Sequence, residues 1–142
     1  MTRWQQASNA GQAGFSLIEA LIALVVLSVG LLGIAALQTQ ALLQSRDAYQ
    51  TSQATSLMQD MADRIRANSE AISDYAHTAG SSPPSGNSLA ANDLKNWLAD
   101  LATTLPDGQA DITTSGNDVR ITVIWQDAED EDRSINIVTE IP

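Results

Sequence analysis

The sequence predicts an α+β protein in which one long amino-terminal helix packs against a small antiparallel sheet. Three observations support this prediction. Residues 15–37 are almost entirely apolar, and residues 38–77 contain neither glycine nor proline but carry apolar side chains at helical spacing. Residues 119–125 and 135–141 instead alternate apolar and polar side chains with period two, and residues 111–114 do so weakly. We therefore expect a helix with a membrane half and an amphipathic half, followed by a sheet.

The apolar segment 15–37 is long enough to cross a membrane. Its only polar side chains are those of Ser16, Glu19 and Ser28. As a helix it would reach roughly 34 Å at about 1.5 Å per residue, which exceeds the apolar thickness of a bilayer. A carboxylate within such a segment costs up to about 3 kcal/mol, so Glu19 needs a partner cation. Cleavage before Phe15 would create one, because the new α-amino group is positively charged.

Gly14, Phe15 and Glu19, with the apolar run behind them, resemble the class III leader of type IV pilins and pseudopilins. The resemblance implies that residues 1–14 are a leader, that a prepilin peptidase cuts after Gly14, and that Phe15 is then N-methylated. It also implies that Glu19 pairs with the amino terminus of a neighbouring subunit during assembly. An uncut signal anchor or a secretory signal peptide is the alternative, but a secretory cleavage site follows its apolar run, whereas Gly14 precedes this one.

Residues 57–71, together with the apolar anchor, are similar to the type IV pilus modification protein PilV family. The resemblance implies a pilin-like fold and a minor pilin that primes pilus assembly in a tip complex, supporting twitching motility and adhesion. The implied partners are the prepilin peptidase and N-methyltransferase, other minor pilins and the assembly platform. The chain would cross the inner membrane once, with its amino terminus cytoplasmic and its carboxy-terminal domain periplasmic, and would then enter the surface pilus.

Two other functions remain alternatives at this point. The first is a minor pseudopilin of a type II secretion system, which shares the leader, the anchor and the small sheet. The second is a membrane-anchored periplasmic module that binds calcium or another ligand. An uncut amino terminus would favour the second.

The amphipathic half of the helix, residues 38–77, carries an apolar stripe that predicts core packing, with a seam for another helix as the alternative. The helix is expected to continue to about Ala76. In the membrane half, Gly30 and Gly33 are candidate points of close helix packing or local unwinding. The stripe consists of Ala54, Leu57, Met58, Met61, Ala62 and Ile65.

The remainder of the chain is predicted to complete the globular domain. Residues 78–91 are rich in glycine, proline and serine and predict a loop. Residues 92–142 are expected to form a helix over 92–104 and a three-stranded antiparallel sheet. The helix should direct Leu94, Trp97, Leu98 and Leu101 inward. The strands are expected at residues 111–114, 119–125 and 135–141, with Val119, Ile121, Val123 and Trp125 on one face and Ile135, Ile137, Thr139 and Ile141 alternating inward.

Composition excludes several classes of function. The net charge is −10, so the chain is not expected to bind nucleic acid through phosphates, and proteins are its expected partners. There is no cysteine and only one histidine, His77, which leaves most hydrolytic machinery without a base. We therefore expect no enzyme, no cofactor and no small-molecule substrate.

One acidic cluster is a weak candidate for calcium. It lacks the spacing of an EF-hand loop, and runs of like charge are usually exposed, so a solvated hairpin tip is the preferred interpretation. Likewise, Trp97 and Trp125 are more typical of core positions than of a ligand site. The cluster consists of Asp127, Glu129, Asp130, Glu131 and Asp132.

Overall fold

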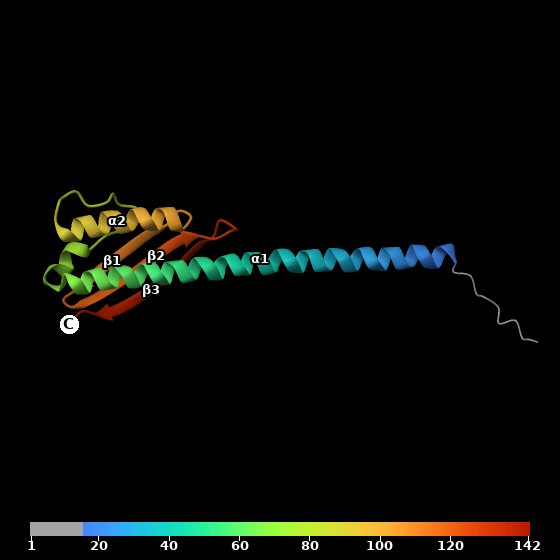
Figure 1. Cartoon of the computed structure of the whole chain (residues 1–142), viewed down its shortest axis with the longest axis horizontal. Helices are drawn as coiled ribbons and strands as arrows, with labels where there is room; N and C mark the ends of the chain where they lie inside the picture. Colours follow the sequence, from blue (N-terminus) through green and yellow to red (C-terminus); the bar gives the residue numbers. More distant parts are fainter. Residues whose placement is uncertain (1–15) are drawn as a thin grey trace, which may run out of the picture. The chain divides into compact units, whose positions relative to one another are not determined.

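The computed structural model describes residues 16–142, which form two units, residues 16–40 and 41–142. The second unit contains a helical layer and an antiparallel sheet, so the predicted α+β class is confirmed (Figure 1). In chain order the elements are α1 (Leu17–Ala67), the 3₁₀ helix η1 (Ser69–Tyr75), α2 (Leu89–Thr104), β1 (Gln109–Ser115), β2 (Asp118–Gln126) and β3 (Asp132–Glu140).

The second half of α1 supplies one wall of the hydrophobic core. The predicted apolar stripe lies against the inner face of the sheet, with only Leu57 partly exposed, so the core-packing interpretation is confirmed. Such burial at spacings of three and four follows from the helical repeat of 3.6 residues. The buried residues of α1 are Gln50, Ala54, Met58, Met61, Ala62 and Ile65.

The sequence predicted that the first helix continues to about Ala76, in a segment assigned as residues 38–77. This prediction was wrong. The α-helix ends at Ala67, and Asn68 leaves the helical region with φ −126° and ψ 46°. Asparagine is a poor residue for a helix interior, and here its side-chain amide donates to the Tyr75 hydroxyl at 3.2 Å. The chain continues as η1, whose Ile72 and Tyr75 are buried. In a 3₁₀ helix residues three apart share one face, so both side chains reach the core.

The predicted start of the second helix at residue 92 was also too late, and the predicted loop 78–91 is correspondingly shorter. Helix α2 begins at Leu89, and Ser88 is its N-cap, because the Ser88 hydroxyl accepts a hydrogen bond from the N–H of Ala91 at 3.1 Å. Serine is among the best N-cap residues, and Ala90 and Ala91 are buried in the first turn. The inward positions of Leu94, Trp97 and Leu101 were predicted correctly, and Leu98 is partly buried.

The sheet is a simple antiparallel meander with strand order β1-β2-β3. Each strand begins earlier than the sequence predicted, and a tight turn at Gly116, with φ 61°, joins β1 to β2. A positive φ is accessible to glycine without steric cost. The inward-facing residues of β2 are buried as predicted, whereas the alternating residues of β3 are only half-buried up to Thr139. Ile141, just beyond β3, is fully buried.

Trp97 joins the helices in the core. Its side chain is fully buried, and its indole N–H donates a hydrogen bond of 2.8 Å to the main-chain carbonyl of Leu57. The bond connects α2 directly to α1 and leaves no polar atom of this indole unpaired. A second connection runs from η1, where the Tyr75 hydroxyl donates to the Asp93 carboxylate at 2.8 Å.

Candidate functional site

The first turn of α1 contains the predicted assembly residue. Glu19 is exposed, and its main-chain N–H donates to the carbonyl of Ser16 at 3.0 Å. A carboxylate in the first turn interacts favourably with the positive end of the helix dipole. Gly14 and Phe15 lie outside the described residues, so the proposed cleavage, methylation and pairing with Glu19 stay predictions.

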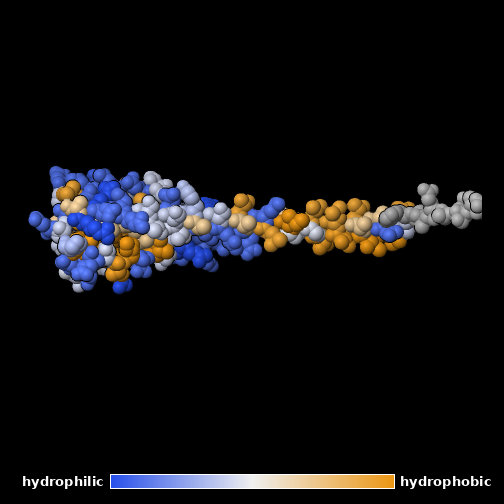
Figure 2. Space-filling view, turned by 60° about the horizontal axis from the view of Figure 1, so that its bottom comes forward, coloured by the Kyte–Doolittle hydropathy of each residue, from blue (hydrophilic) through white to orange (hydrophobic). Residues whose placement is uncertain are grey.

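The remainder of this segment presents apolar side chains on every face. One stretch of α1 is long and apolar enough to cross a membrane, with a mean hydropathy of 2.8 and none of it buried. Figure 2 shows this stretch as a band of hydrophobic side chains. Ser28, a polar residue within it, donates its hydroxyl to the carbonyl of Leu24 at 2.7 Å, so its polar group is satisfied inside the helix. So large an apolar surface requires lipid or other apolar helices to cover it.

Gly30 and Gly33 lie within this segment, and the helix continues through both without a break. A Cβ atom added at either position would meet no atom within 4 Å. Neither glycine is therefore required by a turn or a close contact within residues 16–142. Their predicted roles in close packing between subunits or in local unwinding stay predictions.

The acidic loop between β2 and β3 is organised by one of its own carboxylates. Asp127 is buried, and its Oδ1 accepts hydrogen bonds from the N–H groups of Glu129 at 2.8 Å and Glu131 at 3.0 Å. Its Oδ2 pairs with Nε of Arg133 at 2.8 Å. Among residues 16–142 no three His, Cys, Asp or Glu side chains gather closely enough to hold a metal ion.

The loop should open at acid pH. The backbone N–H groups of Glu131 and Glu129, with the guanidinium of Arg133, lower the pKa of Asp127 below its unfolded value of about 3.9. A depressed pKa stabilises the folded loop fully above about pH 4, and that stabilisation is lost as the pH falls through the folded pKa. Amide exchange protection of Glu129 and Glu131, measured by NMR, should therefore drop at low pH.

The Asp127→Ala variant should lose the same protection already at neutral pH. Asp132→Asn removes a neighbouring exposed carboxylate for which the described residues show no side-chain hydrogen bond, and it should keep the protection. Equal protection in the Asp127→Ala variant and the unmodified chain would contradict the organising role of Asp127.

His77 contributes to the structure through its main chain. Its main chain pairs with Ile112 through two hydrogen bonds, of 3.0 and 2.8 Å, on the edge of β1 that faces away from β2. Partial burial lowers the pKa of the imidazole, against the opposing effect of Asp111. The Ser81 hydroxyl lies 3.4 and 3.5 Å from the two ring nitrogens and donates to the carbonyl of Thr78 instead. This geometry does not activate a nucleophile.

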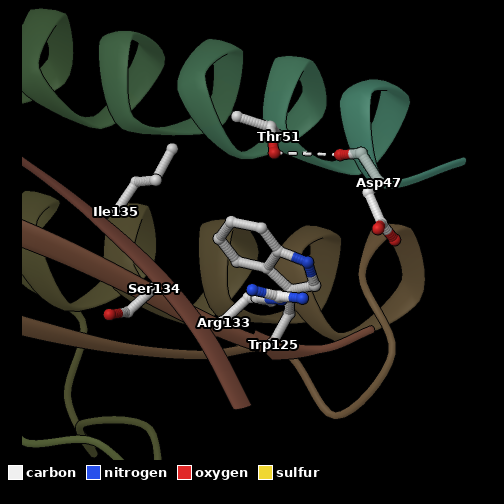
Figure 3. Close-up of a pocket in the computed structure, with 6 residues that line it drawn as sticks. All are labelled: Asp47, Thr51, Trp125, Arg133, Ser134 and Ile135. Carbon is white, nitrogen blue, oxygen red and sulfur yellow. Dashed lines mark hydrogen bonds between the residues drawn. The ribbon is translucent and has the colours of Figure 1, made fainter. Parts of the chain in front are cut away.

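A pocket of about 250 Å³ lies between the second half of α1 and the ends of β2 and β3 (Figure 3). Asp47 and Thr51 come from α1, Trp125 from β2, and Arg133 and Ile135 from β3. The sequence predicted Trp125 as a core residue and did not single out Asp47 or Arg133. For Arg133 the available signal was the acidic run that precedes it. Asp47 lies in a polar stretch of the helix with no pattern that marks it as part of a site. Ser134 completes the lining.

Comparison with known families gives two adjacent matches. Residues 9–35 match the prokaryotic N-terminal methylation motif, and residues 36–92 match the type IV pilin Tt1218 family model. Neither the curated proteins nor the solved structures yield a match. The methylation motif implies processing by a prepilin peptidase and pilus assembly, and the apolar helix fits membrane anchoring. Pilins are structural rather than enzymatic proteins. Taken with the observed fold, the two adjacent matches support the assignment of this chain to the type IV pilins.

Proposed function

We propose that this chain is a minor type IV pilin that joins other minor pilins in a priming complex at the pilus tip. The observation that carries the proposal is the order of the two family matches, a methylation motif at residues 9–35 followed directly by a pilin segment at 36–92. The exposed apolar surface of α1 supports it, because such a helix can move from lipid into a bundle of similar helices without exposure to water.

The proposal divides the chain by function. Residues 1–14 are the leader, residues 15–37 anchor the precursor in the inner membrane and pack in the filament, and the domain from residue 38 onward lies in the periplasm before assembly. Glu19 pairs with the amino group of Phe15 on a neighbouring subunit. The pair compensates two charges in an apolar environment, and it fixes the axial position of one subunit against the next.

The experiment that tests the proposal is an intact-mass measurement of the chain from native membranes and from sheared pili. The expected mature form begins at Phe15, carries one methyl group and occurs in both fractions. A Gly14→Val variant should retain the leader and stay in the membrane fraction. Gly11→Val, a matched change inside the leader, should be processed normally.

Two outcomes would contradict the proposal. A chain that keeps residues 1–14 in cells with active prepilin peptidase would favour the anchored binding module. A mature chain whose loss abolishes protein secretion but leaves piliation and twitching intact would identify a type II secretion pseudopilin.

A further inference from the structure

Three buried polar atoms lack hydrogen-bond partners within residues 16–142; two belong to residues that line the pocket, and the third belongs to Gln50, about one turn along α1 from Asp47. They are the indole nitrogen of Trp125, Oδ1 of Asp47 and Oε1 of Gln50. Trp125 and Asp47 both line the pocket. The Trp125 side chain is 3% exposed. Leaving a buried polar group unpaired is unfavourable, because the group has lost its hydrogen bonds to water without replacing them. Three such groups together indicate that this part of the domain is built to meet something else.

The three unpaired groups comprise two hydrogen-bond acceptors and one donor. Asp47 and Gln50 offer acceptors, whereas Trp125 offers a single donor. Asp47 and Gln50 are three residues apart on α1, so they lie on the same face of the helix. Figure 3 shows the indole nitrogen of Trp125 on the side of the ring that faces Asp47. A ligand at this place would satisfy the groups if it carried several hydrogen-bond donors and one acceptor.

The charge around the pocket determines whether it favours a cationic or an anionic ligand. Arg133 lines the pocket, but its Nε is already paired with Asp127. The loop that joins β2 to β3 and ends beside Arg133 carries the acidic cluster of residues 127–132. The carboxylates of Asp127, Glu131 and Asp47 all act on the Arg133 guanidinium. Around this lining residue, negative charge therefore exceeds positive charge, which attracts cations and repels anions. Indole rings also bind cations through their faces.

We propose that the pocket binds a lysine or arginine side chain of a partner protein. The cationic head donates to Asp47 and Gln50, the aliphatic stem packs on Trp125 and Ile135, and a main-chain carbonyl of the same segment accepts from the Trp125 indole. This proposal does not depend on which filament the chain joins. It makes the acidic surface a selective contact rather than only a source of solubility.

The test uses the full chain in a neutral maltoside detergent, labelled with ¹⁵N, and three peptides. Acetyl-Ala-Lys-Ala-amide and acetyl-Ala-Arg-Ala-amide supply the cation and the carbonyls, and the norleucine analogue has a stem of similar length without charge. The indole N–H resonance of Trp125, assigned with a Trp125→Phe variant, should shift in a saturable way with both basic peptides. The norleucine peptide should bind about tenfold more weakly, because it lacks the charge-assisted hydrogen bonds.

Two variants and one internal control complete the design. Asp47→Asn should weaken the binding of both basic peptides about tenfold. Asp100→Asn, the matched loss of an exposed carboxylate on α2, should leave it unchanged. The indole resonance of Trp97 should stay fixed throughout, because its N–H is bound to Leu57, and it reports that each variant is folded.

Equal shifts with the charged and uncharged peptides would overturn the proposal and identify an apolar pocket. An unmoved Trp125 resonance up to the solubility limit of the basic peptides would also overturn it, and it would assign the unpaired groups to an enclosed water molecule.

Discussion

Replacing Trp97 by alanine should lower the free energy of unfolding of the globular domain by about 3–5 kcal/mol. Trp97 is fully buried and packs in the core formed by both helices and the inner face of the sheet. Removing the indole leaves a large cavity and also deletes the hydrogen bond to the Leu57 carbonyl. Small domains have total stabilities of about 5–15 kcal/mol, so this one change would bring the domain close to unfolding.

The measurement is urea denaturation of the full chain in detergent, and the circular dichroism signal of the sheet monitors the unfolding. Trp97→Phe keeps most of the apolar volume and should cost less, about 1–3 kcal/mol, chiefly from the lost indole hydrogen bond. Leu89→Ala, in the same helix but 59% exposed, should stay within about 0.5 kcal/mol. Similar losses for Trp97→Ala and Leu89→Ala would show that Trp97 does not anchor the core.

Replacing Glu19 by alanine should reduce incorporation into pili by more than about tenfold while leaving cleavage before Phe15 largely intact. In the proposed filament the carboxylate compensates the amino terminus of a neighbour, and an uncompensated charge in an apolar environment costs about 3–5 kcal/mol. The peptidase acts on the bond after Gly14, which the variant retains. Quantitative immunoblots of sheared pili and of membranes give the fraction of the chain that enters pili. Intact-mass measurement gives the fraction that is cleaved before Phe15.

Two further variants separate charge from polarity at this position. Glu19→Gln keeps a polar side chain without its charge and should behave like the alanine variant. Ser28→Ala removes another polar side chain of the apolar segment, one that bonds within its own helix, and should assemble normally. Normal piliation and normal co-purification with other minor pilins in the Glu19→Ala variant would refute the pairing role.

The parts of the fold that the sequence predicted best are those in which one side of an element is buried and the other is solvated. The stripe on α1 and the alternation along β2 each repeat the geometry of their element, so burial could be read directly from spacing. The end of α1 and the start of α2 were predicted poorly, whereas the end of α2 at Thr104 was predicted correctly. Asn68 and Ser88 act through local hydrogen bonds and backbone angles that leave only a single-residue signal in the sequence.

The same distinction separates the two sites. The role of Glu19 could be predicted from the sequence because its whole context lies within a few consecutive residues, and it stays a prediction. The pocket was not, because Asp47 and Trp125 are far apart in the chain and only folding brings them to one place. A tryptophan at a buried, periodic position looks the same in sequence whether its indole nitrogen is paired, as in Trp97 on α2, or unpaired, as in Trp125 on β2.

The hydrogen bonds of His77 and Ser88 also determine where the chain can accept additional residues. The loop between them is fixed at one end by pairing of His77 with Ile112 and at the other by the cap of α2. A peptide tag inserted between Ser82 and Gly86 would therefore lengthen an exposed segment without moving either attachment point. Doubling the length of a flexible loop costs only about 0.6 kcal/mol, so this is the place to attach labels or foreign epitopes to the domain.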